Sequence, residues 1–188
     1  MNGGIRMSKI VIRGGNRLNG KVKISAAKNS VLPIIAASLL TGEECILEDI
    51  PFLEDVNVIL NVLESLGVDL SIYNNKGKVK INTGDLKSFE PSYDLVRKMR
   101  ASFLVMGPIL SRFGRIKISL PGGCNIGSRP IDLHLKGFNQ LGAEINLGHG
   151  YVEASCKRLK GAKVYLDFPS VGATENIMMA AVLADGEQ

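Results

Sequence analysis

The sequence has no tryptophan, and its other aromatic residues are scarce. Aromatic residues make up 5% of the 188 positions, and the 23 lysines and arginines, which give a net charge of +5, are dispersed rather than interleaved with them. A nucleic-acid-binding repeat protein is therefore an alternative that rests on charge alone. Small anionic ligands explain the positive charge equally well.

Long apolar runs, histidines and cysteines are also few. No apolar run reaches the roughly 20 residues that cross a bilayer, and residues 1–9 lack the apolar core of a signal peptide. The two histidines, His134 and His149, do not have the spacing of metal ligands, and the three cysteines show no pairing pattern. We therefore predict a cytoplasmic globular protein with no metal, no membrane partner and no nucleic acid.

A glycine-rich segment with Cys124 at its centre is the most unusual feature of the chain. It follows a predicted strand at 115–120 and precedes a predicted helix that begins at Pro130, a residue favoured at the first helical position. The helix N-terminus and the nearby Arg129 both stabilise an anion and therefore favour thiolate over thiol. We predict that Cys124 donates or accepts a proton, or attacks an electrophile.

The other two cysteines serve as internal controls for this prediction. Cys45 and Cys156 lie in or next to predicted strands, without a glycine-rich loop. A cysteine in such a place is usually a small buried apolar residue. We therefore interpret both as structural.

Two parts of the chain repeat each other, and a third repeat begins near the end of the sequence. The segments around Gly67 and Gly142, 75 residues apart, match class by class, while 163–166 echoes 21–24. Repeats of this size cannot bury a core alone, so neighbours must pack together. Predicted strands lie at 10–12, 21–25, 45–47, 68–72, 78–81, 115–120, 143–147 and 151–155, and predicted helices at 31–40, 53–66, 93–113 and 130–141. In the first of these helices, Asn29 or Ser30 is the expected N-cap and Pro33 is expected in the first turn.

The glycine–cysteine segment, continued by 129–134, resembles the UDP-N-acetylglucosamine 1-carboxyvinyltransferases, the enolpyruvyl transferases that open peptidoglycan precursor synthesis. The resemblance runs from residue 9 to residue 188. The enolpyruvyl transferases of the shikimate pathway share the repeats but lack the Gly-Gly-Cys loop, and they are kept as an alternative. Four further segments support the resemblance by their order and spacing: 27–29, 99–102, 112–114 and 169–174.

This resemblance implies an α/β (α+β) fold, an inside-out α/β barrel of βαβαββ repeats with the helices inside and the sheets outside. Two whole repeats and part of a third are expected in this chain. Residues 1–21 would be a leader plus a strand of a second, mostly absent domain. Residues 22–188 would form a nucleotide-sugar-binding domain that is incomplete in its third repeat. The chain is thus expected to be the front portion of a longer protein, or else a short chain completed by its own dimer partner.

The implied reaction transfers the enolpyruvyl group of phosphoenolpyruvate to the 3′-hydroxyl of UDP-N-acetylglucosamine and releases phosphate, without a cofactor. The resemblance makes Cys124 the proton donor and the residue alkylated by fosfomycin. It assigns phosphoenolpyruvate to Lys28, Asn29 and Arg129. It assigns UDP-N-acetylglucosamine to Arg100, Arg129, Pro130, Ile131, Asp132, Leu133, Ser170, Val171 and Gly172.

The same resemblance places an essential acidic residue and further arginines in the second domain. We therefore expect the 188-residue chain to be inactive alone. A non-catalytic fragment that only binds the UDP-sugar is the corresponding alternative.

Overall fold

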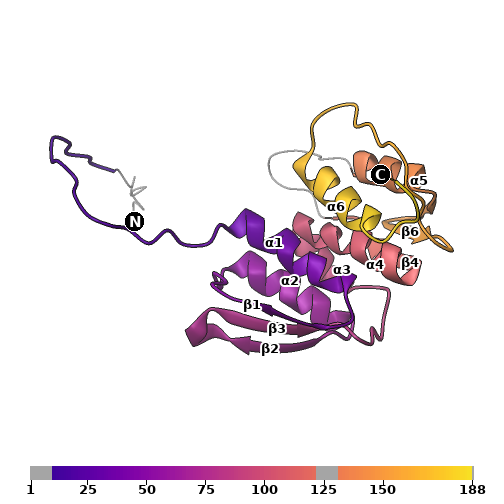
Figure 1. Ribbon diagram of the computed structural model, residues 1–188, viewed down its shortest axis with the longest axis horizontal. Coiled ribbons are helices and arrows are strands. Elements are labelled where there is room, and N and C mark those ends of the chain that lie inside the picture. Colours follow the sequence, from indigo (N-terminus) through magenta and orange to yellow (C-terminus); the bar gives the residue numbers. More distant parts are fainter. Residues whose placement is uncertain (1–9, 122–130, 188) are drawn as a thin grey trace, which may run out of the picture.

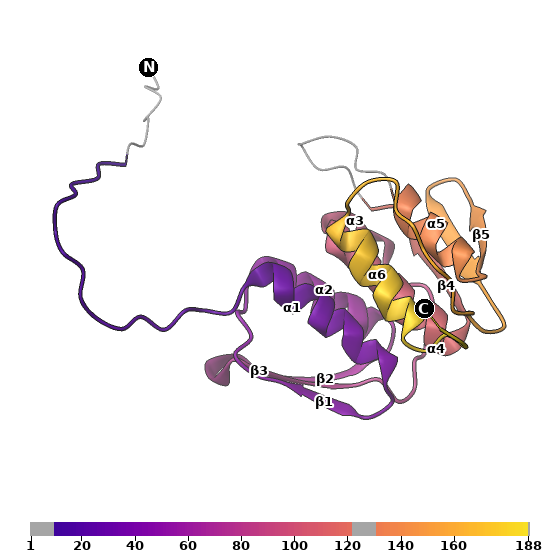
Figure 2. The ribbon, with the colours of Figure 1, turned by 45° about the horizontal axis from the view of Figure 1, so that its top comes forward.

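The computed structural model describes residues 10–121 and 131–187, and within these residues the strands form two antiparallel sheets with helices between them (Figures 1 and 2). Each sheet has three strands, in the orders β1-β3-β2 and β4-β6-β5. The helices therefore form the inner layer, as the inside-out fold requires. The strands are β1 Glu44–Leu47, β2 Asp69–Tyr73, β3 Lys78–Asn82, β4 Arg115–Ser119, β5 Glu144–Leu147 and β6 Tyr151–Ser155.

The helices carry most of the buried apolar side chains. In Figure 2, α1 and α2 cover the first sheet, and α6 lies beside α4 and α5, which adjoin the second sheet. Among the helices of the described part, none is long and apolar enough to span a bilayer. The α-helices are α1 Lys28–Ala37, α2 Glu54–Ser65, α3 Tyr93–Lys98, α4 Met106–Phe113, α5 Asp132–Gln140 and α6 Val171–Ala181, and the 3₁₀ turns are η1 Ser38–Leu40, η2 Asn74–Lys76 and η3 Arg100–Val105.

The predicted repeat is present in the structure as two β-α-β-β units, β1-α2-β2-β3 and β4-α5-β5-β6. Their helices end in the same way, at Gly67 with φ 89° and Gly142 with φ 88°. Each glycine N–H bonds at 2.9 Å to the carbonyl three residues back, and the next N–H bonds to the carbonyl five residues back. Glycine is favoured at this left-handed position because it has no Cβ. The sequence match therefore reports a shared backbone conformation.

Two glycines let α6 approach its neighbours very closely. A Cβ at Gly107 in α4 would lie 2.2 Å from the backbone oxygen of Asn176 in α6. A Cβ at Gly137 in α5 would lie 2.2 Å from Cδ1 of Ile177 in the same helix. Helix α6 thus packs closely on α4 through the backbone at Gly107, and on α5 through the Ile177 side chain that lies over Gly137.

The predicted strands at 10–12 and 21–25 are wrong. Residues 10–27 form neither helix nor strand, and they extend away from the helices (Figure 1). Ile10, Val22 and Ile24 are 91%, 88% and 87% exposed. A strand needs a hydrogen-bonding neighbour, and these residues meet none in the described chain. Residues 163–166, which echo them, also form no strand for the same reason.

Two predicted helices differ from those observed. The predicted helix 93–113 is interrupted at Met99, whose φ of −143° and ψ of 125° are extended. The predicted helix 31–40 begins earlier, at Lys28, and neither Asn29 nor Ser30 caps it, because the N-cap is Ala27 without a side-chain bond. Pro33 is consequently the sixth helical residue and lies beyond the first turn. Apolar periodicity missed the break at Met99 because it continues through that residue, and it missed the start of α1 because residues 28–30 are polar.

Candidate functional site

A cavity of about 390 Å³ opens where the N-terminal ends of α1, α5 and α6 meet η3. Five of the predicted binding residues line it: Asn29, Arg100, Ile131, Val171 and Gly172. They come from four segments that are far apart in the sequence. The extended backbone at Met99 ends α3 and starts η3 at Arg100, so the helix interruption helps to place Arg100 beside this cavity.

Lys28 lies at the edge of this region, as the first residue of α1. Its Nζ forms an ion pair with Asp55 Oδ2 of α2 at 2.6 Å, and the two side chains are 45% and 34% exposed. Asp55 was not predicted to have any role near the site. The ion pair connects α1 to α2 next to Asn29, and it leaves the Lys28 side chain accessible to an anionic ligand.

Three further predicted residues of the described part, Asp132, Leu133 and Ser170, do not line the cavity. Asp132 and Leu133 open α5, and Leu133 is buried at 6% exposure. Ser170 is the N-cap of α6, and its Oγ accepts the N–H of Ala173 at 3.3 Å. The structure therefore gives Ser170 a capping function. Cys124, Arg129 and Pro130 lie outside the described residues, in the segment between β4 and the cavity residue Ile131.

The N-terminus of α6 offers backbone donors to the cavity. The N–H of Thr174 donates to the carbonyl of Ser170 at 2.9 Å, and the N–H of Ala173 donates to the side-chain oxygen of Ser170. The preceding N–H groups, of Val171 and Gly172, have no partner within the helix. Free N–H groups and the helix dipole together favour an anion. Arg100 adds a positive charge in the same cavity.

His134 is a cavity residue to which the sequence assigned no role. It is 4% exposed, and its Nδ1 lies 3.1 Å from Nδ2 of Asn176. Burial, assisted by the charge of Arg100, lowers the pKa of His134 from its usual 6.5 to about 4. His134 follows Ile131 by three residues, so both lie on one side of the start of α5. This spacing was the sequence signal that could have pointed to His134. Burial also raises the pKa of Glu175, which lies on the α6 side of the cavity.

The depressed pKa of His134 predicts acid destabilisation. As pH falls below about 6.5 the unfolded chain takes up a proton that the folded chain resists until about pH 4, so up to about 3 kcal/mol of stability is lost across this window. Urea unfolding at pH 7, 5.5 and 4.5 measures the loss. His134→Gln should reduce it, whereas exposed His149→Gln should not. Equal acid sensitivity in both variants would contradict this assignment.

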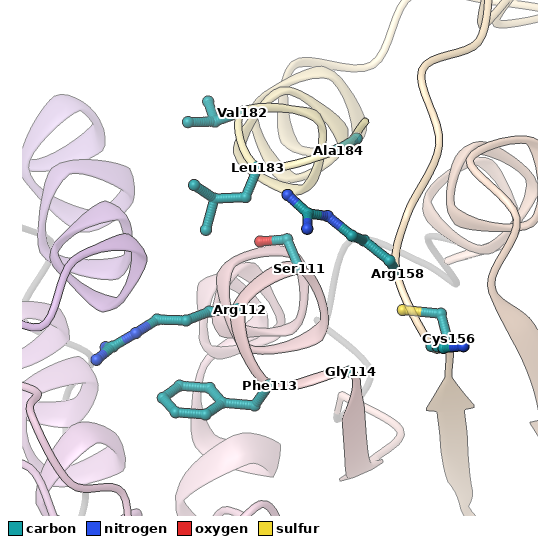
Figure 3. A pocket seen from close by; sticks show the side chains of 10 residues that line it. Ser111, Arg112, Phe113, Gly114, Cys156, Arg158, Val182, Leu183 and Ala184 are labelled. Carbon is teal, nitrogen blue, oxygen red and sulfur yellow. The ribbon is translucent and has the colours of Figure 1, made fainter. Parts of the chain in front are cut away.

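A second hollow, of about 610 Å³, contains none of the predicted site residues (Figure 3). Arg158 lies on one side of it and is paired with Asp185 at 2.8 Å. Cys156 lies below, where burial raises the pKa of its thiol. Its Sγ is 3.7 Å from the carbonyl oxygen of Leu110. These properties disfavour a reactive thiolate and agree with the structural role predicted for Cys156.

Comparisons with known proteins agree with this fold. Residues 12–188 match the family model described as EPSP synthase (3-phosphoshikimate 1-carboxyvinyltransferase). Among solved structures, the enolpyruvyl transferase NikO from Streptomyces tendae superposes with a TM-score of 0.70 at 21% identity, covering 90% of this chain and 39% of that chain. EPSP synthase from Acinetobacter baumannii gives a TM-score of 0.68 at 19% identity, covering 89% of this chain and 39% of that chain. The predicted enolpyruvyl-transferase fold is thus confirmed.

Curated relatives are much more similar in sequence. UDP-N-acetylglucosamine 1-carboxyvinyltransferase 2 of Clostridium tetani is 62% identical over 181 residues, which are 96% of this chain and 43% of the relative. UDP-N-acetylglucosamine 1-carboxyvinyltransferase 1 of Caldanaerobacter subterraneus is 64% identical over 179 residues, 95% of this chain and 42% of the relative. The chain thus spans less than half the length of these relatives, and the predicted resemblance to their family is confirmed. Its match to the family model over residues 12–188, its repeated β-α-β-β units and its inner helices show that this chain belongs to the EPSP synthase family of enolpyruvyl transferases.

Proposed function

We propose that this chain supplies the nucleotide-sugar-binding part of a cytoplasmic UDP-N-acetylglucosamine 1-carboxyvinyltransferase. The proposed enzyme moves the enolpyruvyl group of phosphoenolpyruvate to the sugar 3′-hydroxyl and releases phosphate, the first committed step of peptidoglycan precursor synthesis. The observation that carries the proposal is the meeting of Asn29, Arg100, Ile131, Val171 and Gly172 at one cavity. Relatives that are 55–64% identical and bear this name support the choice of substrate. We propose the domain limits 1–21 and 22–188 on the same basis.

The cavity suits the binding half of this reaction. A nucleoside diphosphate sugar carries two adjoining phosphates, and the free N–H groups of Val171 and Gly172 lie close to the cation Arg100. Asn29 offers both an amide donor and a carbonyl acceptor to the hydroxyl and acetamido groups of a sugar. The accessible ammonium of Lys28, with Arg129, is proposed for phosphoenolpyruvate, which carries a phosphate and a carboxylate.

The proposed chemistry requires one proton donor besides these binding groups. The sugar hydroxyl adds to C2 of phosphoenolpyruvate while C3 takes a proton, which gives a tetrahedral intermediate. Loss of a proton from C3 and departure of phosphate then restore the double bond in the product. We propose Cys124 as the donor in the addition step, because its thiol is placed by sequence ahead of a helix N-terminus.

A binding fragment without turnover is the second candidate. It is favoured by the share of the relatives, 42–43%, that this chain spans. We expect the purified chain to bind UDP-N-acetylglucosamine and to release no phosphate from phosphoenolpyruvate. Turnover by the chain alone would show that it is an active transferase and not only a binding fragment. Competition by shikimate 3-phosphate but not by the UDP-sugar would instead favour the shikimate-pathway alternative.

Fosfomycin alkylation tests the assignment of Cys124. Intact-mass analysis and peptide mapping should find one adduct, on Cys124, which forms at least about tenfold faster with UDP-N-acetylglucosamine present because the bound sugar completes the anion site. Cys156→Ser, which removes a structural cysteine, should leave the adduct unchanged, and Cys124→Ser should abolish it. An adduct on Cys45 or Cys156, or equal labelling of the Cys124→Ser variant, would refute the special role of Cys124.

A further inference from the structure

A buried amide joins three helices directly behind the proposed binding cavity. Asn176 of α6 is fully buried, at 0% exposure. Its Oδ1 accepts the N–H of Gly107 at 2.8 Å, and its Nδ2 donates to the carbonyl of Phe103 at 2.9 Å. A flipped amide would place a donor against a donor and an acceptor against an acceptor, so these two bonds fix which end is nitrogen.

The orientation of this amide determines the protonation of His134. One hydrogen of Nδ2 is used by Phe103, and the other faces Nδ1 of His134 across 3.1 Å. That ring nitrogen must therefore accept, so it carries a lone pair. The imidazole is held as the neutral tautomer with its hydrogen on Nε2. The low pKa of His134, caused first by burial and then by the charge of Arg100, agrees with this state.

The remaining ring nitrogen faces the N-terminus of α6. A Cβ built on Gly172 would lie 3.8 Å from Nε2 and 3.7 Å from Cε1 of His134. Within the described residues Nε2 has no protein hydrogen-bond partner, and His134 lines the cavity. Because His134 lines the cavity, a ligand oxygen bound there can accept the hydrogen of Nε2.

We propose that His134 is a binding residue that donates from Nε2 to a diphosphate oxygen of the UDP-sugar, and that Asn176 is the positioning residue that fixes this tautomer. The inference rests on the proposed function. The N–H groups of Val171 and Gly172 and the Nε2–H then form one wall of donors, with Arg100 in the same cavity. Glu175 is one turn further along α6, beyond these donors. A neutral imidazole contributes a directed hydrogen bond here, while Arg100 contributes the charge.

Two variants, in each of which an amide replaces one ring nitrogen, separate the cavity donor from the bond to Asn176. In His134→Gln the amide nitrogen replaces Nε2, so the cavity keeps a donor. In His134→Asn the side chain ends near the position of Nδ1, so a partner for Asn176 is kept and the cavity donor is lost. Isothermal titration with UDP should give a Kd within about threefold of the parent for the first and about tenfold weaker for the second. Equal affinities, or the reverse order, would overturn the proposal.

Ring nitrogen NMR of the parent chain completes the test. We expect Nδ1 to be unprotonated, Nε2 to be protonated, and the Nε2–H signal to shift on addition of UDP or UDP-N-acetylglucosamine but not uridine. Backbone signals of Val171 and Gly172 report ligand binding independently. If these amides shift with UDP while the Nε2–H does not, the role of His134 is refuted and the proposed function stands. If neither shifts, both fail. A hydrogen on Nδ1 would refute the role of Asn176.

Discussion

Replacing Asn176 by alanine should lower the free energy of unfolding by about 4 kcal/mol, because three buried groups lose their partner together. These are the N–H of Gly107, the carbonyl of Phe103 and Nδ1 of His134, which belong to three different elements. Alanine also leaves a void at a fully buried position. Urea unfolding followed by circular dichroism at pH 7 measures the change.

Asn139→Ala is the matched control for this effect. Asn139 is the same residue type on a neighbouring helix, but its side chain makes one long bond, 3.4 Å to the carbonyl of Ala143, and it is exposed. Its loss should change stability by less than about 1 kcal/mol. If the two variants lose similar stability, the Asn176 bonds do not hold the three elements together.

Arg112→Met should lower the free energy of unfolding by about 3 kcal/mol, because the guanidinium connects the two repeats through carbonyl oxygens. Its Nη1 lies 2.7 Å from the carbonyl oxygen of Thr41, 2.9 Å from that of Thr83 and 3.2 Å from that of Leu39. Methionine keeps much of the aliphatic bulk but leaves these oxygens without the donor. Burial lowers the pKa of Arg112, because the guanidinium gives up water molecules when it bonds to these carbonyl oxygens.

Arg115→Met provides the control, since Arg115 is exposed and stacks over Phe89 with its Cζ 4.6 Å from the ring centroid. Its loss should lower stability by less than about 1 kcal/mol. Arg112→Lys should fall between the parent and Arg112→Met, because an ammonium reaches fewer of the carbonyl oxygens. If Arg112→Met is as stable as Arg115→Met, the three carbonyl oxygens must be hydrogen-bonded to water instead, which would contradict the prediction.

Local sequence signals predicted the features that depend on neighbouring residues. Gly67 and Gly142 marked the ends of α2 and α5 because the left-handed conformation favours glycine. The extended backbone at Met99 was missed because apolar periodicity continues through it, and the start of α1 at Lys28 was missed because its first three residues are polar. The strands at 10–12 and 21–25 failed for another reason. Their pattern was that of strands, but pairing requires a neighbour at a distance in sequence that the pattern cannot name.

The residues of the candidate site also fall into those that the sequence predicted and those that it missed. Asn29, Arg100, Val171 and Gly172 were found through resemblance to a family, and the structure brings them to one cavity. The bond between His134 and Asn176 spans 42 residues and joins two residue types that carry no spacing rule. Such a pair is visible only after α5 and α6 have been placed side by side. The ion pair of Lys28 with Asp55 was missed for the same reason.

The close glycine contacts of α6 would couple the proposed ligand site to the packing of the helices. Gly107 lets α6 approach the backbone of α4, and Gly137 of α5 leaves room for the Ile177 side chain of α6, so both contacts are closely packed. The same helix presents Val171 and Gly172 to the cavity. Separation of α6 from α4 and α5 would therefore also move the N–H groups that we propose as ligand donors. By linkage, a nucleotide bound at the proposed site would raise the free energy of that separation by RT ln(1 + [L]/Kd), and we expect a variant that loosens the contact to weaken binding without touching the ligand.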